Sequence, residues 1–312
     1  MKLANTTGDY EKCGLSDLQR VKGLYDAGFR CIDLSMYQGN KADWEYFRPD
    51  WEEKVLKLKA YADELGITFV QAHSPGGNPL AGDGSWELLR ASTLRSIEIC
   101  GMLGIKNNVF HVGWQDDVLY DKAGERKFFD RNVKRLEELY PTMEKWGVNL
   151  LVENSTKANM AERYYFYTGD EMKRFIDFAG HPLIHACWDT GHGNIEGRQY
   201  DHLVALGDDL RALHVNDNLK GGDEHIMPFM GTVNMDEIMH GLMDAGYTGY
   251  FTFECDSVVV NPGYWQGARR RFDGDDRLSR VPVEVQQAVE QLLYTTGRYI
   301  LKTYGLWEDE TI

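Results

Sequence analysis

The sequence predicts a single α/β domain with the (β/α)8 (TIM) barrel fold, on three observations. Short runs rich in β-branched and aromatic residues alternate with longer stretches of helical periodicity, which is typical of parallel strands with helices packed outside them. The 312 residues suit one barrel of about 250 residues with additional loops. No low-complexity segment or linker divides the chain, so we expect one domain over residues 1–312, with an inserted loop around 256–280.

The first elements follow from residues that begin and end helices. A strand at 2–5 precedes a helix that starts at the N-cap candidate Ser16 and runs to residue 27, where Gly28 supplies the C-terminal turn. A second helix begins near Trp51, with apolar residues at helical spacing, and Gly66 ends it. The strands expected before and after this helix are 30–35 and 67–72.

The remaining elements repeat this order. A helix over 86–103 precedes a strand at 108–110, and a helix over 127–146 precedes a strand at 149–152. The last three strands and the closing helix are expected at 184–188, 211–213, 250–253 and 285–302. A count of eight strands favours a closed barrel over an open doubly wound sheet.

The third to the eighth expected strands each end at a side chain that can bind a metal. In chain order these residues are His73, His111, Glu153, Asp189, His214 and Glu254. His192 follows Asp189 in the segment DTGH, and the loop after the seventh strand adds Asp223 and His225. Because the active sites of such barrels lie at the carboxyl ends of the strands, we expect these side chains to converge there.

Convergence of these side chains predicts a divalent metal site. Carboxylates that emerge from buried strands repel one another strongly unless a cation lies between them. Three carboxylates with one imidazole, from Glu153, Asp189, Glu254 and His214, suit Mn²⁺, Mg²⁺ or Co²⁺, whereas additional histidines favour Zn²⁺. The alternative is a purely structural polar network, because a single buried histidine or strand-end carboxylate often serves only to satisfy its neighbours.

With these residues the chain, from about His73 to Glu254, resembles the xylose isomerase-like barrel superfamily. In its isomerases and epimerases, a Glu, Asp, His and Glu from four strands bind one divalent metal, and the resemblance gives these roles to Glu153, Asp189, His214 and Glu254. It also implies that Glu153 and Glu254 exchange the substrate proton and that His192, in DTGHGNIEG, contacts substrate oxygens. The implied enzyme is an isomerase or epimerase of a ketose or related polyol, working through a metal-stabilised enediolate.

Three other functions are compatible with the same residues. An inosose-type dehydratase would eliminate water at the same metal site, and a non-catalytic barrel would only bind a sugar. The AP endonucleases of this superfamily bind three zinc ions through nine ligands, and compatible residue types occur here in order: His73, His111, Glu153, Asp189, His192, His214, Asp223, His225 and Glu254. Trp114, just beyond His111, is expected either to form an apolar wall for sugar C–H groups or to pack within its loop.

The amino-acid composition limits the classes of partner that the protein can bind. A formal net charge of -15 disfavours nucleic acid, because binding to a phosphate backbone draws on Lys and Arg, although 269–271 is a short arginine run. No signal peptide and no run of about 18 apolar residues is evident, so we expect a cytoplasmic protein without a membrane partner, acting on a small sugar. The five cysteines form no CxxC pair, which favours reduced thiols. The sequence does not decide whether the protein is a monomer or a homo-oligomer.

Overall fold

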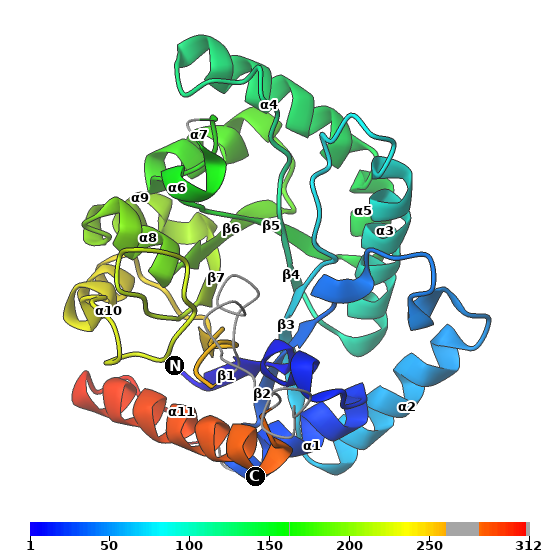
Figure 1. Cartoon of the computed structure of the whole chain (residues 1–312), viewed down its shortest axis with the longest axis vertical. Coiled ribbons are helices and arrows are strands. Elements are labelled where there is room, and N and C mark those ends of the chain that lie inside the picture. Colours follow the sequence, from blue (N-terminus) through cyan, green and yellow to red (C-terminus); the bar gives the residue numbers. More distant parts are fainter. Residues whose placement is uncertain (162, 260–280, 310–312) are drawn as a thin grey trace, which may run out of the picture.

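The computed structural model describes residues 1–161, 163–259 and 281–309, and in it an eight-stranded parallel sheet curls into a barrel (Figure 1). The strand order is β7-β6-β5-β4-β3-β2-β1-β8, so each strand lies beside its neighbours in sequence. The strands are β1 (Leu3–Thr6), β2 (Cys31–Ser35), β3 (Thr68–His73), β4 (Asn107–Phe110), β5 (Asn149–Glu153), β6 (Ile184–Asp189), β7 (Leu210–His214) and β8 (Phe251–Phe253). The predicted barrel is confirmed.

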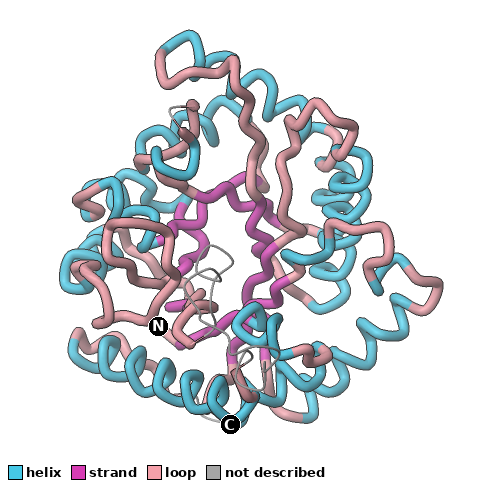
Figure 2. Tube along the Cα trace, in the orientation of Figure 1, coloured by secondary structure: helices cyan, strands magenta, loops and turns pink. Residues whose placement is uncertain are grey.

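Helices form a ring outside the strands (Figure 2). They are α1 (Asp17–Ala27), α2 (Trp51–Glu64), α3 (Trp86–Leu103), α4 (Lys122–Glu137), α5 (Tyr140–Trp146), α6 (Lys157–Met160), α7 (Gly169–Ala179), α8 (Thr190–Glu196), α9 (Tyr200–Leu206), α10 (Met235–Asp244) and α11 (Val283–Thr303). Short 3-10 turns lie at η1 (Thr7–Cys13), η2 (Tyr37–Gly39), η3 (Glu45–Phe47) and η4 (Gly207–Asp209). Among the helices described, none combines the length and the apolar character needed to cross a membrane.

The ring closes at a short seam between β7 and β8. Val215 and Phe253 form an isolated parallel bridge there. The Val215 N–H donates to the Thr252 carbonyl (2.8 Å), and the Glu254 N–H donates to the Val215 carbonyl (3.2 Å). Every other pair of neighbouring strands is joined by a ladder of two or more paired residues. In the described residues, the junction of β7 and β8 therefore has the fewest backbone pairings in the barrel.

On the side formed by β4 to β7, the inside of the barrel is apolar directly beneath the expected site. Val109, Leu151, Cys187 and Ala212, from β4 to β7, form a small buried cluster of their own. Side chains two residues apart on a strand share one face. Leu151, Cys187 and Ala212 are each followed two residues later by a predicted ligand, namely Glu153, Asp189 and His214. The two-residue period of the strands therefore places these ligands one layer of side chains above this apolar cluster.

One predicted helix was wrong in its extent. The stretch 127–146 forms two helices, α4 and α5, instead of one, and α4 begins earlier because Asp121 caps it by accepting from the Gly124 N–H (2.7 Å). Pro141 stands in the first turn of α5, where its missing N–H is tolerated, whereas within a continuous helix it would break the hydrogen-bond ladder. The loop predicted around 256–280 lies outside the described residues from 260 onward.

A buried pair of carboxyl groups joins α11 to the start of the chain. Asp9 in η1 and Glu290 in α11 are 1% and 0% exposed. Asn5 donates through Nδ2 to Asp9 Oδ2 (3.0 Å) and also to Glu290 Oε2, while Gln286 Nε2 donates to Glu290 Oε1 (2.7 Å). Burial raises the pKa of Glu290 to about 8 despite these donors, and burial with the nearby Glu290 charge raises the pKa of Asp9. The pair therefore favours a shared proton.

Candidate metal centre and substrate pocket

The residues predicted at the strand ends all lie at one mouth of the barrel. His73, Glu153, Asp189 and His214 are the last residues of β3, β5, β6 and β7. His111 directly follows β4, and Glu254 directly follows β8. Parallel strands bring their carboxyl ends to the same edge, and this is why residues far apart in sequence meet here.

Glu153, Asp189, His214 and Glu254 form a central group. One ligand atom from each lies within 4.8 Å of the others. His214 Nδ1 is 2.8 Å from Glu153 Oε1 and 3.2 Å from Glu254 Oε2. Three carboxylates and one imidazole pointing at a common point, in a largely buried place, fit a divalent cation that prefers oxygen ligands.

His73 and His111 approach the central group through Glu153. His111 Nε2 is 2.8 Å from Glu153 Oε2, and the two Nε2 atoms of His73 and His111 are 3.2 Å apart. His73 Nδ1 lies 2.8 Å from the Ser74 carbonyl and so carries the proton it donates there. His73 Nε2 therefore faces the site, where His111 Nε2 and Glu153 Oε2 (3.8 Å) are its neighbours, as in a metal-binding or substrate-binding histidine.

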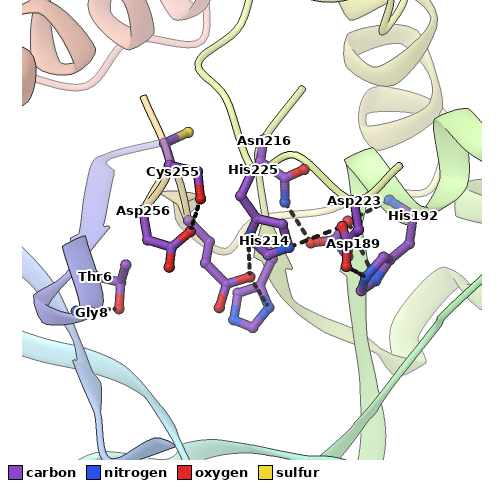
Figure 3. A network of polar contacts seen from close by, with 12 residues as sticks. Thr6, Gly8, Asp189, His192, His214, Asn216, Asp223, His225, Cys255 and Asp256 are labelled. Carbon is purple, nitrogen blue, oxygen red and sulfur yellow. Dashed lines mark hydrogen bonds and ion pairs between the residues drawn. The ribbon is translucent and has the colours of Figure 1, made fainter. Parts of the chain in front are cut away.

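His192, Asp223 and His225 form an outer group beside Asp189. His192 Nε2 is 2.9 Å from Asp223 Oδ2, and His225 Nε2 is 3.1 Å from Asp223 Oδ1. Figure 3 shows Asp189, His192 and Asp223 together on one side of His214. His225 has a φ of 48°, a backbone conformation that non-glycine residues rarely adopt. All nine residues singled out in the sequence thus lie in one continuous cluster.

The pKa values of the two central glutamates are shifted in opposite directions. Burial acts to raise the pKa of Glu153, but the charge of His214 and hydrogen bonds from His111 and His214 outweigh it and hold that pKa well below its usual range. Burial raises the pKa of Glu254 to about 7, opposed by His214 and His225 and supported by the Glu153 charge. A divalent cation among these ligands would lower the pKa of both glutamates.

His192 is held in its charged form by its neighbours. Burial acts to lower its pKa, but the carboxylates of Asp189 and Asp223 outweigh that effect and raise the pKa to about 10. Burial acts to raise the pKa of Asp223, yet the nearby His192 and His225 lower it. The outer group can therefore act as a set of charged hydrogen-bonding partners as well as a set of metal ligands.

A cavity of about 590 Å³ opens above the cluster. Glu153 and Glu254 line it, whereas Asp189 and His214 are 0% exposed and lie beneath. The apolar part of the wall comes from Tyr37, Trp114, Met160 and Tyr165, and polar groups include Glu11, Asn78, Asn159 and Asp256. Such a mixture of aromatic faces and convergent polar groups suits a small polar ligand.

Trp114 lies in the wall of the cavity and is also held within its own loop. Its ring lines the cavity, and the Arg163 guanidinium lies 4.5 Å from the ring centroid. The Asn78 side chain fixes the Trp114 backbone, because Asn78 Oδ1 accepts from the Trp114 N–H (3.0 Å) and Asn78 Nδ2 donates to the Trp114 carbonyl (2.9 Å). Loop packing therefore presents the indole to the pocket.

Sequence reasoning missed the residues that hold the ligands in place. Asn216 Nδ2 donates to Asp189 Oδ2 (2.6 Å), and Asn154 pairs with the Asp189 backbone through both its amide atoms (2.7 and 3.0 Å). A Cβ on Gly191 would lie 1.9 Å from Asn216 Oδ1, so only glycine fits in this part of DTGH. The asparagines in ENS and HVND, each next to or two residues after a predicted ligand, were the available signal.

Comparisons with known proteins identify the family. A family model described as xylose isomerase-like TIM barrel matches residues 21–273. This match covers more than half of the chain, and the chain therefore belongs to that family. The resemblance inferred from the sequence is confirmed.

One curated relative and two solved structures are similar to this chain. Fructoselysine 3-epimerase of Escherichia coli O157:H7 is 39% identical over 145 residues, 46% of this chain and 52% of that protein. The chain spans about half the length of the curated relatives that it matches. D-psicose 3-epimerase of Clostridium cellulolyticum H10, solved with D-tagatose, has a TM-score of 0.72 and 21% identity, over 96% of this chain and 99% of that chain. The IolI protein with a bound zinc atom has a TM-score of 0.69 and 15% identity, over 97% and 99%.

Proposed function

We propose that this protein is a divalent-metal-dependent isomerase or epimerase of a ketose or a related polyol. Glu153, Asp189, His214 and Glu254 would hold the cation, and Glu153 and Glu254 would also transfer the substrate proton. Membership of the xylose isomerase-like family and likeness to a fructoselysine 3-epimerase both support sugar chemistry. The negative net charge of the chain also favours a small neutral substrate over a polyanion.

One observation carries the proposal: only two members of the central group reach the pocket. Glu153 and Glu254 line the cavity, while Asp189 and His214 are fully buried beneath it. A structural network would have no reason to turn two carboxylates toward an open cavity. A proton-transfer enzyme needs a base and an acid within reach of one substrate carbon.

The chemistry follows from the position of the two glutamates. When bound, the cation supplies Lewis-acid polarisation of a carbonyl, which makes the adjacent C–H acidic. One of the two glutamates, in its ionised form, takes that proton as general base, and the other, which must start in its protonated form, gives its proton as general acid. His192 donates to substrate oxygens, and Trp114 offers an apolar face to the sugar C–H groups. Inversion at carbon 3, as in the named epimerases, requires the two glutamates to act on opposite faces of that carbon.

A trinuclear zinc phosphodiesterase is the second candidate, and a specific observation favours it. The structure gathers further donor groups around the central one, including His73, Glu153 and His214 on one side and Asp189, His192 and His225 on the other. With Glu254, His111 and Asp223, these six residues make nine donors, which could hold three zinc ions. The acidic lining from Glu11, Asp256 and Asp223 opposes a DNA phosphate backbone.

Elemental analysis of the purified, unchelated protein tests the metal centre first. We expect about one Mn, Co or Mg ion per chain, because the central group offers three oxygen ligands and one imidazole. A content near three zinc ions would instead support the phosphodiesterase and direct the next assay to abasic DNA. Absence of bound metal even after reconstitution would contradict the metal centre and favour a structural network.

Product analysis in D₂O separates the remaining functions. The loaded protein is incubated with fructoselysine, D-psicose, D-tagatose and D-fructose, and the products are identified by NMR. Deuterium at the reacting carbon of an isomeric product supports an isomerase or epimerase, whereas a dehydrated product supports the dehydratase. Saturable binding without deuterium incorporation or product would identify a sugar-binding barrel and overturn the enzymatic proposal.

A further inference from the structure

A buried carboxylate lies on the far side of the imidazole of His214. Asp33, on β2, and His214, at the end of β7, are both 0% exposed. Strands β2 and β7 are not neighbours in the sheet, because β1 and β8 separate them. The approach of Asp33 Oδ2 to His214 Nε2 (3.6 Å) therefore crosses the inside of the barrel, directly under the site.

The two nitrogens of His214 face different partners. Nδ1 points at the glutamates of the central group, 2.8 Å from Glu153 Oε1 and 3.2 Å from Glu254 Oε2. Nε2 is buried and has no hydrogen-bond partner among the described residues. An imidazole that binds a metal through one nitrogen keeps its proton on the other. A buried N–H without an acceptor is costly, so the ligating form of His214 needs an acceptor near Nε2.

Asp33 is fixed in place and still has acceptor capacity. Gln71 Nε2 donates to Asp33 Oδ2 (3.0 Å), and Gln71 Oε1 accepts from Thr252 Oγ1 (3.3 Å), which ties β2, β3 and β8 together. Asp33 Oδ1 is buried and has no hydrogen-bond partner in the part of the chain that the structure describes. At 3.6 Å the contact with His214 Nε2 is longer than a hydrogen bond, and a movement of a few tenths of an ångström would close it.

We propose that Asp33 is a positioning residue for the metal ligand His214. Its carboxylate accepts a hydrogen bond from the Nε2–H group, which keeps the Nδ1 lone pair directed at the cation and fixes the plane of the ring. This inference rests on the metal centre proposed above. Asp33 lies behind the ring, outside the three groups whose donor atoms converge on possible ion positions, so it acts through His214 and not as a ligand.

The dissociation constant for Mn²⁺ and Zn²⁺ tests this role directly. We expect Asp33→Asn in the full chain to weaken binding by roughly 10- to 100-fold, as measured by titration calorimetry after removal of bound metal with a chelator. Asp33 Oδ2 is the oxygen that lies nearest both Gln71 Nε2 and His214 Nε2. The amide of the variant would therefore place there either an uncharged oxygen, which is a weaker acceptor than a carboxylate, or an NH2 group, which would favour the tautomer with the proton on Nδ1. Asp9→Asn is the matched control, because Asp9 is an equally buried aspartate of η1 that accepts a hydrogen bond from Asn5 and does not contact His214. We expect it to leave the dissociation constant unchanged.

NMR of the wild-type protein gives a second test that does not depend on the metal affinity of an Asp33 variant. In zinc-loaded protein labelled with ¹⁵N-histidine, we expect His214 to show a metal-bound Nδ1 and a protonated Nε2. Its signals are assigned by their loss in His214→Asn. Ligation through Nε2, or an unprotonated Nε2, would overturn the inference.

The outcomes separate this inference from the proposal on which it rests. If the wild-type chain binds no divalent cation, the metal centre itself fails. If the wild type binds the cation and Asp33→Asn binds it equally well, Asp33 has no positioning role and the metal centre stands. Equal weakening by Asp33→Asn and Asp9→Asn would reduce the effect to a general cost of altering a buried aspartate, which also overturns the inference.

Discussion

Turnover is expected to fall by about 10²- to 10⁴-fold when Glu254 is replaced with Gln, because the amide can neither take nor give a proton in the reaction. The replacement keeps the size of the side chain, and Glu254 lies after β8 outside the apolar core, so the fold should persist. Activity is measured with the substrate found in the product screen, together with circular dichroism and the melting temperature.

Glu153→Gln is expected to abolish turnover for the same reason and to weaken metal binding more. Glu153 contacts both His111 and His214 at 2.8 Å, so its charge also holds the histidines in place. Glu224→Gln serves as the control, since Glu224 accepts from the Leu219 N–H in the neighbouring loop and does not line the cavity. Full activity in either Glu153→Gln or Glu254→Gln would refute the proton-exchange mechanism.

The free energy of unfolding is expected to depend strongly on pH because of the buried Asp9–Glu290 pair. The folded chain raises the pKa of Glu290 from 4.5 to about 8, chiefly through burial. The folded state therefore binds a proton that the unfolded state has lost across this range. The stability due to this proton is fully present below about pH 4.5 and is lost as the pH rises toward 8, by an amount on the order of a few kcal/mol.

Glu290→Gln should remove this dependence. We expect the melting temperature of the wild type to fall more steeply between pH 5 and pH 9 than that of the variant, as measured by calorimetry in the presence of a chelator. Glu284→Gln is the matched control, because Glu284 lies on the same helix with its side chain exposed, and its slope should match the wild type. If the melting temperatures of Glu290→Gln and wild type changed with pH by the same amount, the pair would not titrate in this range.

Local patterns in the sequence were sufficient to predict the barrel. Strand ends lie within one or two residues of the predicted positions, since alternating turn residues and apolar runs mark them, and α1 starts after Ser16 and ends before Gly28 as expected. The single helix predicted over 127–146 was wrong because its apolar face continues past Pro141, and periodicity alone gave that face more weight than the proline.

The strand-end rule also predicted which side chains meet, but not what supports them. His73, Glu153 and His214 were found because the carboxyl ends of parallel strands share one edge. Asp33 was missed because its partner lies across the barrel on a strand that is not its neighbour, and sequence spacing carries no signal for such a contact. The roles of Glu153 and Glu254 in catalysis stay predictions until the variants are measured.

A cation at the proposed metal centre would have a second consequence at the seam between β7 and β8. His214 and Glu254 stand on either side of it, where one bridge between Val215 and Phe253 closes the ring. A cation bound to both side chains would hold β7 and β8 together at the junction of the barrel that has the fewest backbone pairings in the described residues. Ligands from separate strands couple metal binding to folding. Hydrogen exchange should then report the loading state: the amides of Val215 and Glu254 should exchange more slowly with the cation bound, and chelation should loosen the barrel at this junction first.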